Sequence, residues 1–245
     1  MIPKIIHYCW FGGKALPVLA EKCIESWKKY CPDYKLMLWN ESNFDLNSNA
    51  YVREAYDAKK FAFVTDYVRL WALYNYGGIY MDTDVEVLKP LDRFLGHQAF
   101  SGFESFDRVP TGIMASEQFG EWVARELEYY QGRHFLKEDG SSDMTTNVTI
   151  ITNNLVKEGF KLNNTYQEHN GIVTMYPCEY FCPKDYKSKE LVFFTENTHA
   201  IHHFSGSWLS LRSRLRMIIC LLLQKRCPAL FLCIRQIKKS WKISK

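Results

Sequence analysis

Two carboxylates, Asp82 and Asp84, stand two residues apart in the apolar stretch GGIYMDTDVEV, residues 77–87. The stretch predicts a β-strand, in which residues two apart point to the same face, so both side chains would project side by side. Two like charges at a partly buried position repel each other and resist desolvation unless a cation lies beside them. Oxygen ligands favour Mg²⁺, Mn²⁺ or Ca²⁺ over zinc. The pair therefore predicts a divalent-metal site, although a D-x-D sequence also occurs where two aspartates simply face water.

A second charged pair, Asp66 and Arg69, lies on a predicted helix that leads directly into this strand. Residues three apart in a helix are neighbours on one face, so the two side chains would meet. On an open surface such an ion pair is worth only about 0.2–0.5 kcal/mol. Beside a metal, the same pair is suited to binding the hydroxyl groups of a polar ligand, because a carboxylate accepts hydrogen bonds and a guanidinium donates them.

The elements that must position these residues follow an α/β order. Residues 3–39 predict a strand, a helix and a second strand, which is the βαβ unit that opens a parallel sheet. Residues 51–76 are predicted to be mostly helical, with Gly77 as the C-cap, and a strand over 79–88 follows. One α/β domain over residues 1–208 is expected. Its remaining predicted elements are short strands and loops over 92–115, a helix over 116–132, and short strands with loops over 145–208.

Three segments of the chain, taken in order, resemble one enzyme family. The stretch FVTDYVRLWALYNYGGIYMDTDVEVLKPL, residues 63–91, is similar to the signature of the family 32 glycosyltransferases, a helix with D-x-x-R followed by G-G-x-Y-x-D-x-D. IPKIIHYCWFGG, residues 2–13, resembles the first strand of that family, and AIHHFSGSW, residues 200–208, resembles its closing motif. The family includes fungal mannosyltransferases and bacterial capsule and O-antigen enzymes, and glucosylating bacterial toxins carry a similar signature.

The resemblance implies a GT-A fold, a Rossmann-like nucleotide-binding α/β sandwich. It implies a nucleotide sugar as donor, with Mn²⁺ or Mg²⁺ held by the D-x-D against the diphosphate, where negative charge grows as the glycosidic bond breaks. Asp84 is then the better candidate for a direct metal ligand, with Asp82 at the metal and at the sugar or ribose. Asp66 and Arg69 match the positions that orient the donor sugar.

The first strand contributes two candidate donor contacts by the same resemblance. Trp10 matches the position whose ring stacks on the nucleotide base, and a flat ring at a strand end beside a Gly-Gly turn suits that role. A buried core tryptophan is the alternative. Tyr8 lies on the same face of the strand as Trp10, so we expect it to share the pocket.

The closing motif HHFSGSW is expected to complete the metal or diphosphate site. Strand alternation lets only one histidine face inward, and we favour His203 over His202 as the metal ligand. Ser207 and Trp208 are expected at the donor, with Trp208 covering the β-phosphate. The toxins carry a carboxylate near this point. A histidine here therefore differs from the toxin motif, and this difference affects which metal the site prefers.

The reaction implied by the family retains the configuration of the anomeric carbon. A double displacement needs a carboxylate nucleophile, and the sequence identifies none. We therefore expect a front-face substitution in which the departing phosphate helps to deprotonate the acceptor. Residues 109–114 and 145–148 fall in regions that line the acceptor and sugar pocket in the family, but no motif assigns roles there.

The positive charge of the chain is concentrated at its C-terminal end. The net charge is +4, from 31 basic and 27 acidic residues. Residues 209–245 hold ten Lys or Arg and no Asp or Glu, which leaves 21 basic and 27 acidic residues, a charge of −6, in residues 1–208. Apolar clusters alternate with these cations, so we predict a tail of short amphipathic helices on an anionic membrane. A packing helix or an oligomer contact is the alternative, and the acidic body gives nucleic-acid binding no support.

Composition places the chain among ordinary globular proteins, with 47% hydrophobic and 24% charged residues. The N-terminus has too short an apolar run for a signal peptide, so the eight cysteines are expected to be reduced thiols. Cys178 and Cys182 form a lone C-x3-C, which disfavours a zinc site. The expected location is cytoplasmic, on the inner face of the membrane.

These observations predict a metal-dependent retaining glycosyltransferase of surface polysaccharide synthesis. It would move a hexose from UDP-galactose or UDP-glucose to a glycan acceptor that is lipid-linked. A metal-dependent phosphohydrolase could use the same aspartates, but it would not require Trp10 or the Asp66–Arg69 pair. A non-catalytic membrane-surface adaptor on a degenerate GT-A scaffold is the other alternative, and it would not turn over a nucleotide sugar.

Overall fold

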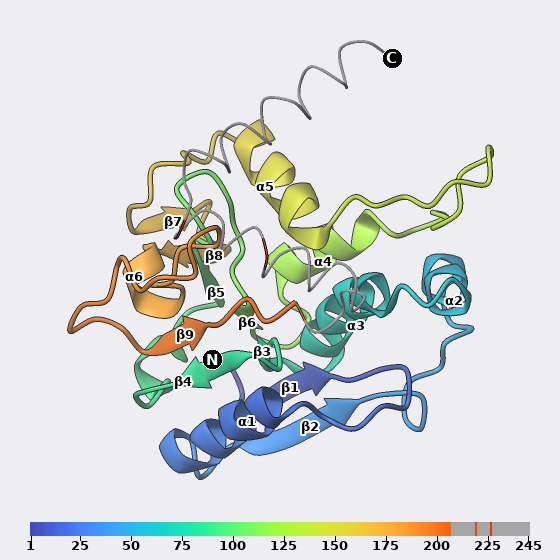
Figure 1. The fold of residues 1–245 in the computed structure, drawn as a ribbon. Helices are drawn as coiled ribbons and strands as arrows, with labels where there is room; N and C mark the ends of the chain where they lie inside the picture. Colours follow the sequence, from blue (N-terminus) through green and yellow to red (C-terminus); the bar gives the residue numbers. More distant parts are fainter. Residues whose placement is uncertain (207–218, 220–225, 227–245) are drawn as a thin grey trace. The chain divides into compact units, whose positions relative to one another are not determined.

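A computed structural model describes residues 1–206, together with Ile219 and Arg226 (Figure 1). The chain divides into two units, Met1–Ser205 and Gly206–Lys245. The expected donor contacts Ser207 and Trp208, and the predicted basic tail apart from two residues, lie outside the described residues. Within the described part, no helix is long and apolar enough to span a membrane.

A seven-stranded sheet forms the centre of the first unit (Figure 1). Its strand order is β2-β1-β3-β6-β5-β8-β7. β1 is parallel to both β2 and β3, and β5 is parallel to β8, whereas β6 and β7 run antiparallel to their neighbours. The strands of this sheet are β1 (Ile5–Cys9), β2 (Lys35–Trp39), β3 (Gly78–Met81), β5 (Ala99–Gly102), β6 (Ile113–Ser116), β7 (Gln167–His169) and β8 (Val173–Tyr176). A separate two-stranded sheet pairs β4 (Val85–Val87) with β9 (Ala200–His202).

Helices cover both faces of the large sheet and create two cores. On one face, sheet residues such as Tyr80 and Met114 pack with buried side chains of α2, α3, α4 and α5. On the other, Ile79 and Ile113 pack with α1, α6 and the small sheet. The alternation of side chains along each strand explains why neighbouring residues join different cores. The helices are α1 (Val18–Tyr30), α2 (Ala50–Asp57), α3 (Phe61–Tyr76), η1 (Asp92–Phe94), α4 (Glu121–Glu128), α5 (Asn147–Lys157) and α6 (Cys178–Phe181).

The predicted α/β class is confirmed, as is the opening βαβ unit formed by β1, α1 and β2. The helix that was expected to lead into the D-x-D strand is also present. α3 ends at Tyr76, and its C-cap Gly77 has a φ of 62°, which glycine adopts without the steric cost of a side chain. β3 begins at the next residue, so Asp66 and Arg69 are connected rigidly to the strand that carries the first aspartate.

The prediction of one strand over residues 79–88 is wrong. β3 ends at Met81 and β4 begins at Val85 in a different sheet, so Asp82 and Asp84 lie in the turn between them. The Asp82 N–H donates to the carbonyl of Gly112 (2.8 Å), and the Val85 N–H donates to the carbonyl of Asp82 (2.9 Å). These two hydrogen bonds turn the chain from one sheet to the next. The aspartates are therefore brought together by a turn, not by strand alternation.

The prediction of only short strands and loops after residue 145 is also wrong, because α5 occupies Asn147–Lys157. Its N-cap is Thr146, whose hydroxyl accepts the Thr149 N–H (3.4 Å). Ile150, Ile151 and Leu155 are buried along one side of the helix. Its many β-branched and asparagine residues have weak helix propensity, so packing against the rest of the unit must stabilise this helix.

Candidate active site

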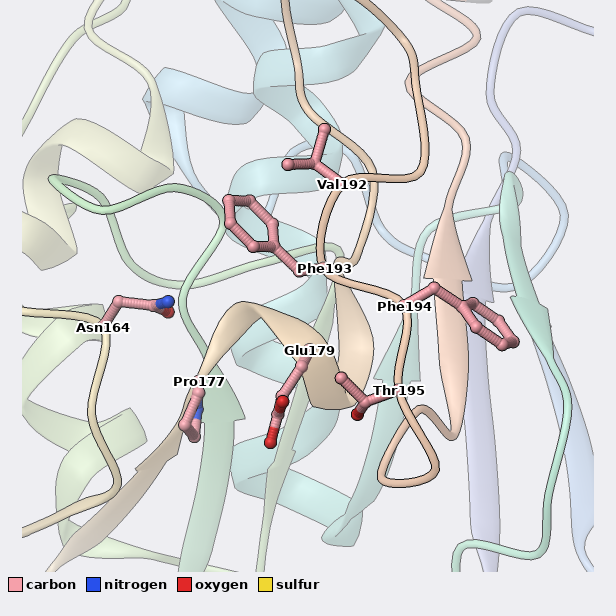
Figure 2. A pocket seen from close by; sticks show the side chains of 7 residues that line it. All are labelled: Asn164, Pro177, Glu179, Val192, Phe193, Phe194 and Thr195. Carbon is pink, nitrogen blue, oxygen red and sulfur yellow. The ribbon is translucent and has the colours of Figure 1, made fainter.

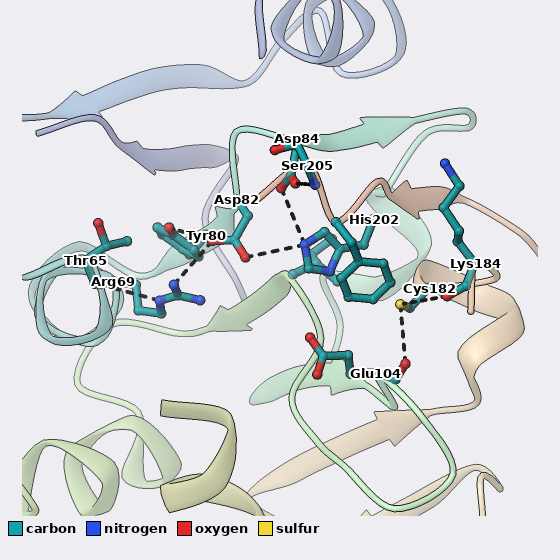
Figure 3. Close-up of polar contacts among 12 residues, drawn as sticks. Thr65, Arg69, Tyr80, Asp82, Asp84, Glu104, Cys182, Lys184, His202 and Ser205 are labelled. Carbon is teal, nitrogen blue, oxygen red and sulfur yellow. Dashed lines mark hydrogen bonds and ion pairs between the residues drawn. The ribbon is translucent and has the colours of Figure 1, made fainter. Parts of the chain in front are cut away.

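Three potential metal ligands converge where the small sheet meets the end of β3. Figure 3 shows Asp82 and Asp84, from the β3–β4 turn, pointing toward His202 of β9. The Nε2 atom of His202 lies 3.4 Å from Asp84 Oδ1 and 3.9 Å from Asp82 Oδ2. One ligand atom from each of the three residues lies within 4.8 Å of the others. This spacing allows a single cation to contact all three side chains.

The electrostatics of this cluster favour bound positive charge. Burial disfavours the imidazolium of His202, but the Asp84 carboxylate outweighs it and raises the histidine pKa well above its usual value. Burial likewise opposes the charged form of Asp84, but His202 and the backbone N–H of Ser205, 2.6 Å from Asp84 Oδ2, lower the Asp84 pKa well below its usual range. Without a metal the cluster therefore holds a proton at His202 Nε2, the atom that faces both carboxylates.

The cluster fits a divalent ion by its shape as well as its chemistry. A Cβ atom added at Gly112 would lie 3.1 Å from both Asp82 Oδ2 and His202 Cε1, so a side chain there would press on two of the three groups. The imidazole of His202 is buried beside Phe204, and the centroids of the two rings lie 4.1 Å apart. Two carboxylates and one imidazole form a mixed oxygen and nitrogen donor set for a divalent ion.

A second network, centred on Arg69, adjoins the cluster. Its Nη2 atom lies 3.3 Å from Asp66 Oδ1 and 3.2 Å from Asp82 Oδ1. The guanidinium lies over the ring of Tyr80, 4.6 Å from its centroid, and the Tyr80 hydroxyl donates to Asp82 Oδ1 (2.9 Å). Burial raises the pKa of Asp66 to about 6, although Arg69 opposes this shift. The predicted pairing of Asp66 with Arg69 is thus present, and Arg69 also connects Asp66 to the D-x-D.

Asn147 belongs to this network but was not assigned a role from the sequence. Its backbone N–H donates to Asp66 Oδ2 (3.0 Å), and its Nδ2 donates to the Asp66 carbonyl (3.0 Å). Its Oδ1 is buried and has no hydrogen-bond partner within the described part of the chain. Asn147 is the first residue of α5, so the N-terminal end of that helix faces a carboxylate, as the helix dipole favours. The N-cap threonine before the apolar residues Val148, Ile151 and Leu155 at helical spacing was the sequence signal that could have revealed it.

The two histidines of the closing motif point to different partners. His202, the second choice from the sequence, is the one beside the aspartates. His203, the favoured one, places its Nε2 2.8 Å from Glu86 Oε2 and its Nδ1 3.0 Å from Lys184 Nζ. The register of β9 decides this, because His202 pairs with Val85 and so shares the start of β4 with Asp84.

Trp10 and Tyr8 are not joined to the aspartates by any contact among the described residues. The indole N–H of Trp10, which follows β1, donates to the Lys14 carbonyl (2.5 Å). Tyr8 packs edge-on against Trp27 at 5.5 Å, and the Trp27 indole N–H donates to the carbonyl of Val85 (2.7 Å). Tyr8 is thus linked to the β4 side of the site through Trp27. Their roles as donor contacts remain predictions.

A surface pocket of about 420 Å³ lies elsewhere on this unit, between the start of α6 and residues 192–195 (Figure 2). None of the residues of the metal cluster or of the Arg69 network lines it. The pocket is therefore separate from the candidate active site.

Comparison with known proteins points to glycosyltransferases. Residues 17–101 match the family model described as the glycosyltransferase sugar-binding region containing a DXD motif. The match includes both charged pairs, Asp66 with Arg69 and Asp82 with Asp84, which confirms the predicted relationship to glycosyltransferases.

Named relatives agree with this relationship. The chain is 33% identical over 121 residues to inositol phosphoceramide mannosyltransferase 3 of Schizosaccharomyces pombe, covering 46% of this chain and 33% of that one. It is 26% identical over 216 residues to an uncharacterized glycosyltransferase, L373, of Acanthamoeba polyphaga mimivirus, covering 85% of this chain and 84% of that one. The chain thus spans only about a third of the length of the first of these relatives.

Two solved structures of glycosyltransferases align with this chain at TM-scores below 0.5. The galactosyltransferase LgtC, solved with donor and acceptor sugar analogues, aligns with a TM-score of 0.45 at 13% identity, over 88% of this chain and 94% of that one. A glycosyltransferase involved in glycosylation of the major capsid of PBCV-1 aligns with a TM-score of 0.46 at 13% identity, over 88% of this chain and all of that one.

Proposed function

We propose that this chain is a divalent-metal-dependent glycosyltransferase of the GT-A class that uses a nucleotide sugar. The observation that carries the proposal is the convergence of Asp82, Asp84 and His202 beside the network of Asp66 and Arg69. A site for a cation thereby adjoins a site rich in hydrogen-bond donors and acceptors. A nucleotide sugar needs both, since its diphosphate is anionic and its sugar presents hydroxyl groups.

In this proposal Asp82, Asp84 and His202 hold Mn²⁺ or Mg²⁺. Such an ion, when bound, neutralises the charge that grows on the diphosphate as the sugar leaves. Arg69 donates to the hydroxyl groups of the donor sugar, while Asp66 accepts from them. The ring of Tyr80 and the carboxylates on either side hold the guanidinium in one orientation. Such fixed geometry lowers the entropic cost of orienting the sugar.

The proposal extends to the donor sugar and the acceptor. We propose transfer of a hexose with retention, by a front-face route, to a lipid-linked glycan of surface polysaccharide synthesis. The family resemblance favours UDP-galactose or UDP-glucose, whereas the names of the fungal relatives favour a mannosyl donor and an inositol phosphoceramide acceptor. Those names also support a lipid acceptor in general. The basic tail over 209–245 would hold the enzyme at an anionic membrane surface on the cytoplasmic side.

The test is hydrolysis of a panel of UDP- and GDP-sugars in the presence of Mn²⁺, with EDTA, and with Asp84→Asn. We expect one nucleotide to be released in a metal-dependent manner, and the release to be lost in the variant. Asp57→Asn is a matched control, because Asp57 pairs with Arg53 on the surface. If no nucleotide sugar binds even with Mn²⁺, the proposal fails. Binding without turnover would favour the adaptor, and phosphate release from simple phosphate esters would favour the phosphohydrolase.

A further inference from the structure

Lys189 is a cationic side chain near the candidate metal site to which neither the motifs nor the proposed function assigns a role. It lies on the loop between α6 and β9 and is partly buried. Its ammonium donates to the carbonyl of Phe204 (3.1 Å) and lies over the rings of Tyr186 and Phe204, 4.6 Å and 4.8 Å from their centroids. These partners are neutral, so they do not balance the charge of the lysine. Burial lowers the pKa of Lys189, and an anion beside it would stabilise its charged form.

A single peptide group links this ammonium to the D-x-D. The carbonyl of that group, from Phe204, accepts from Lys189. Its N–H, from Ser205, donates to Asp84 Oδ2 (2.6 Å), and Figure 3 shows this end of the link. Two hydrogen bonds across one peptide group put Lys189 Nζ no more than about 8 Å from that carboxylate oxygen. An anion held at Asp84 by a metal ion therefore lies within reach of the flexible lysine stem.

Phe204 adopts an uncommon backbone conformation at this link. Its φ is 54°, in the left-handed region that bulky residues rarely adopt. Its ring packs against both the imidazole of His202 and the ring of Tyr186. Such strained residues concentrate at ligand-binding sites, where the surrounding structure holds them in place. The segment that supplies a metal ligand therefore also fixes the position of Lys189.

The charges of the proposed site leave a bound diphosphate without a counter-charge of its own. The two positive charges of a divalent ion are matched by the carboxylates of Asp82 and Asp84, and Arg69 is matched by Asp66. A nucleotide sugar adds the negative charge of its diphosphate, which grows as the sugar leaves. A further cation beside the metal would stabilise that charge.

Lys189 is the cation that remains for this purpose. Arg69 already lies between two carboxylates. Lys184, on the same loop as Lys189, contacts His203 Nδ1 (3.0 Å). The other nitrogen of that histidine, Nε2, lies 2.8 Å from Glu86 Oε2, so a carboxylate ends this chain of contacts. Among the described residues, by contrast, the ammonium of Lys189 contacts a carbonyl and two aromatic rings but forms no ion pair.

We propose that Lys189 binds the diphosphate of the nucleotide sugar, an inference that rests on the proposed function. The ammonium donates to a phosphate oxygen, and because it carries three N–H donors it keeps the Phe204 carbonyl as a second acceptor. The contact becomes stronger as the bond from the anomeric carbon to the diphosphate breaks, because the departing oxygen gains negative charge. Lys189 thus shares with the metal the stabilisation of the departing nucleoside diphosphate.

The experiment measures the binding of UDP and of GDP to the full chain by calorimetry in the presence of Mn²⁺, so it requires no turnover. Lys189→Gln should weaken the binding of whichever nucleotide the wild-type chain prefers by about tenfold or more, since a charge-assisted hydrogen bond is lost. Lys189→Arg should keep part of the affinity, because it keeps the cation. Lys187→Gln is the matched control, because Lys187 is an exposed lysine of the same loop, and it should bind the nucleotide as the wild-type chain does.

A second titration separates a ligand contact from a structural role at the Phe204 carbonyl. The Mn²⁺ affinity of Lys189→Gln without nucleotide, followed by electron paramagnetic resonance, should not fall below that of the wild-type chain, because no metal ligand is removed. Unchanged nucleotide affinity in Lys189→Gln would overturn the proposal, as would a loss of Mn²⁺ affinity as large as the loss of nucleotide affinity. A wild-type chain that binds neither UDP nor GDP would instead refute the proposed function.

Discussion

His202 and His203 are adjacent in sequence, but they lie in different electrostatic environments. His202 faces the two carboxylates of Asp82 and Asp84, whereas His203 lies between Glu86 and Lys184. A cation at His203 would have to compete with the ammonium of Lys184. At His202 it would replace only a proton. The difference identifies His202 as the better ligand, although the sequence alone favours the other histidine.

This difference predicts that His202→Asn lowers the Mn²⁺ affinity by more than about tenfold, because even outer-shell changes at metal sites cost 10–100-fold. His203→Asn should leave the Mn²⁺ affinity nearly unchanged, and it provides the control. Titration of Mn²⁺ followed by electron paramagnetic resonance measures both affinities without requiring turnover. Equal losses in the two variants, or a loss confined to His203→Asn, would contradict this assignment.

Gly112 provides a test of the shape of the same site. In Gly112→Ala the new Cβ would lie 3.0 Å from Val85 Cγ2 and 3.1 Å from Asp82 Oδ2 and His202 Cε1. These neighbours must move, so we expect weaker Mn²⁺ binding and a loss of about 1–3 kcal/mol in the free energy of unfolding.

Chemical denaturation and Mn²⁺ titration measure the two effects of Gly112→Ala. Gly96→Ala is the matched control, because nothing lies within 4 Å of the position its Cβ would take. If Gly112→Ala bound Mn²⁺ as well as the wild-type chain, the three groups would not form one compact site.

At the scale of secondary-structure elements, the sequence predicts correctly those elements that depend only on residues close together in the chain. The α3–Gly77–β3 unit needs only a periodic apolar stripe, a glycine and an apolar strand, all within about two dozen residues. The D-x-D turn could not be predicted in the same way. The chain leaves the strand at Met81 because Gly112 accepts the next N–H and β9 pairs with β4. Both partners are remote in sequence.

The same distinction applies to the residues of the candidate site. Asp66, Arg69, Asp82 and Asp84 were identified because they fall in one continuous signature. The choice between the histidines depends on the register between β4 and β9, which strand alternation alone does not fix. Asn147 lies at the start of a helix, and only tertiary structure brings it to the site.

The buried side chain of His7 links β1 to neighbouring elements by hydrogen bonds. Its burial predicts that the free energy of unfolding depends on pH. The Trp39 indole N–H donates to His7 Nδ1 (3.1 Å), so His7 must carry its proton on Nε2, which donates to the Gly77 carbonyl (2.8 Å). Burial lowers the pKa of His7 from 6.5 to about 4. Between these two values the unfolded chain binds more protons than the folded chain.

The free energy of unfolding should therefore fall as the pH is lowered from 6.5 to about 4, by roughly 3 kcal/mol from His7 alone. Urea denaturation across that range, compared with His7→Gln, measures the contribution. The variant should be less stable at neutral pH, because it loses two buried hydrogen bonds, but it should show a shallower decline toward pH 4. Parallel curves for the two proteins would mean that His7 does not set this dependence.

At the scale of the whole molecule, charge is divided between the two ends of the chain. Residues 1–208 carry 21 basic and 27 acidic residues, whereas 209–245 carry ten basic residues and no acidic ones. An anionic lipid surface would repel the first part and attract the second. Binding of this kind would be sensitive to salt, because exposed charges are screened over about 10 Å at 0.1 M ionic strength.

Neutralising four cations of the tail in the full chain tests this interpretation. Replacement of Lys238, Lys239, Lys242 and Lys245 by glutamine should weaken binding to phosphatidylserine-containing vesicles by 100-fold or more, since each cation near an anionic surface contributes on the order of 1 kcal/mol. Vesicle sedimentation measures the bound fraction, and Mn²⁺ affinity should not change because an ammonium group is not a metal ligand. Vesicles of phosphatidylcholine alone provide the uncharged control. If both proteins bound the two kinds of vesicle equally, the basic tail would not be an electrostatic anchor, and a packing or oligomer contact would explain its composition better.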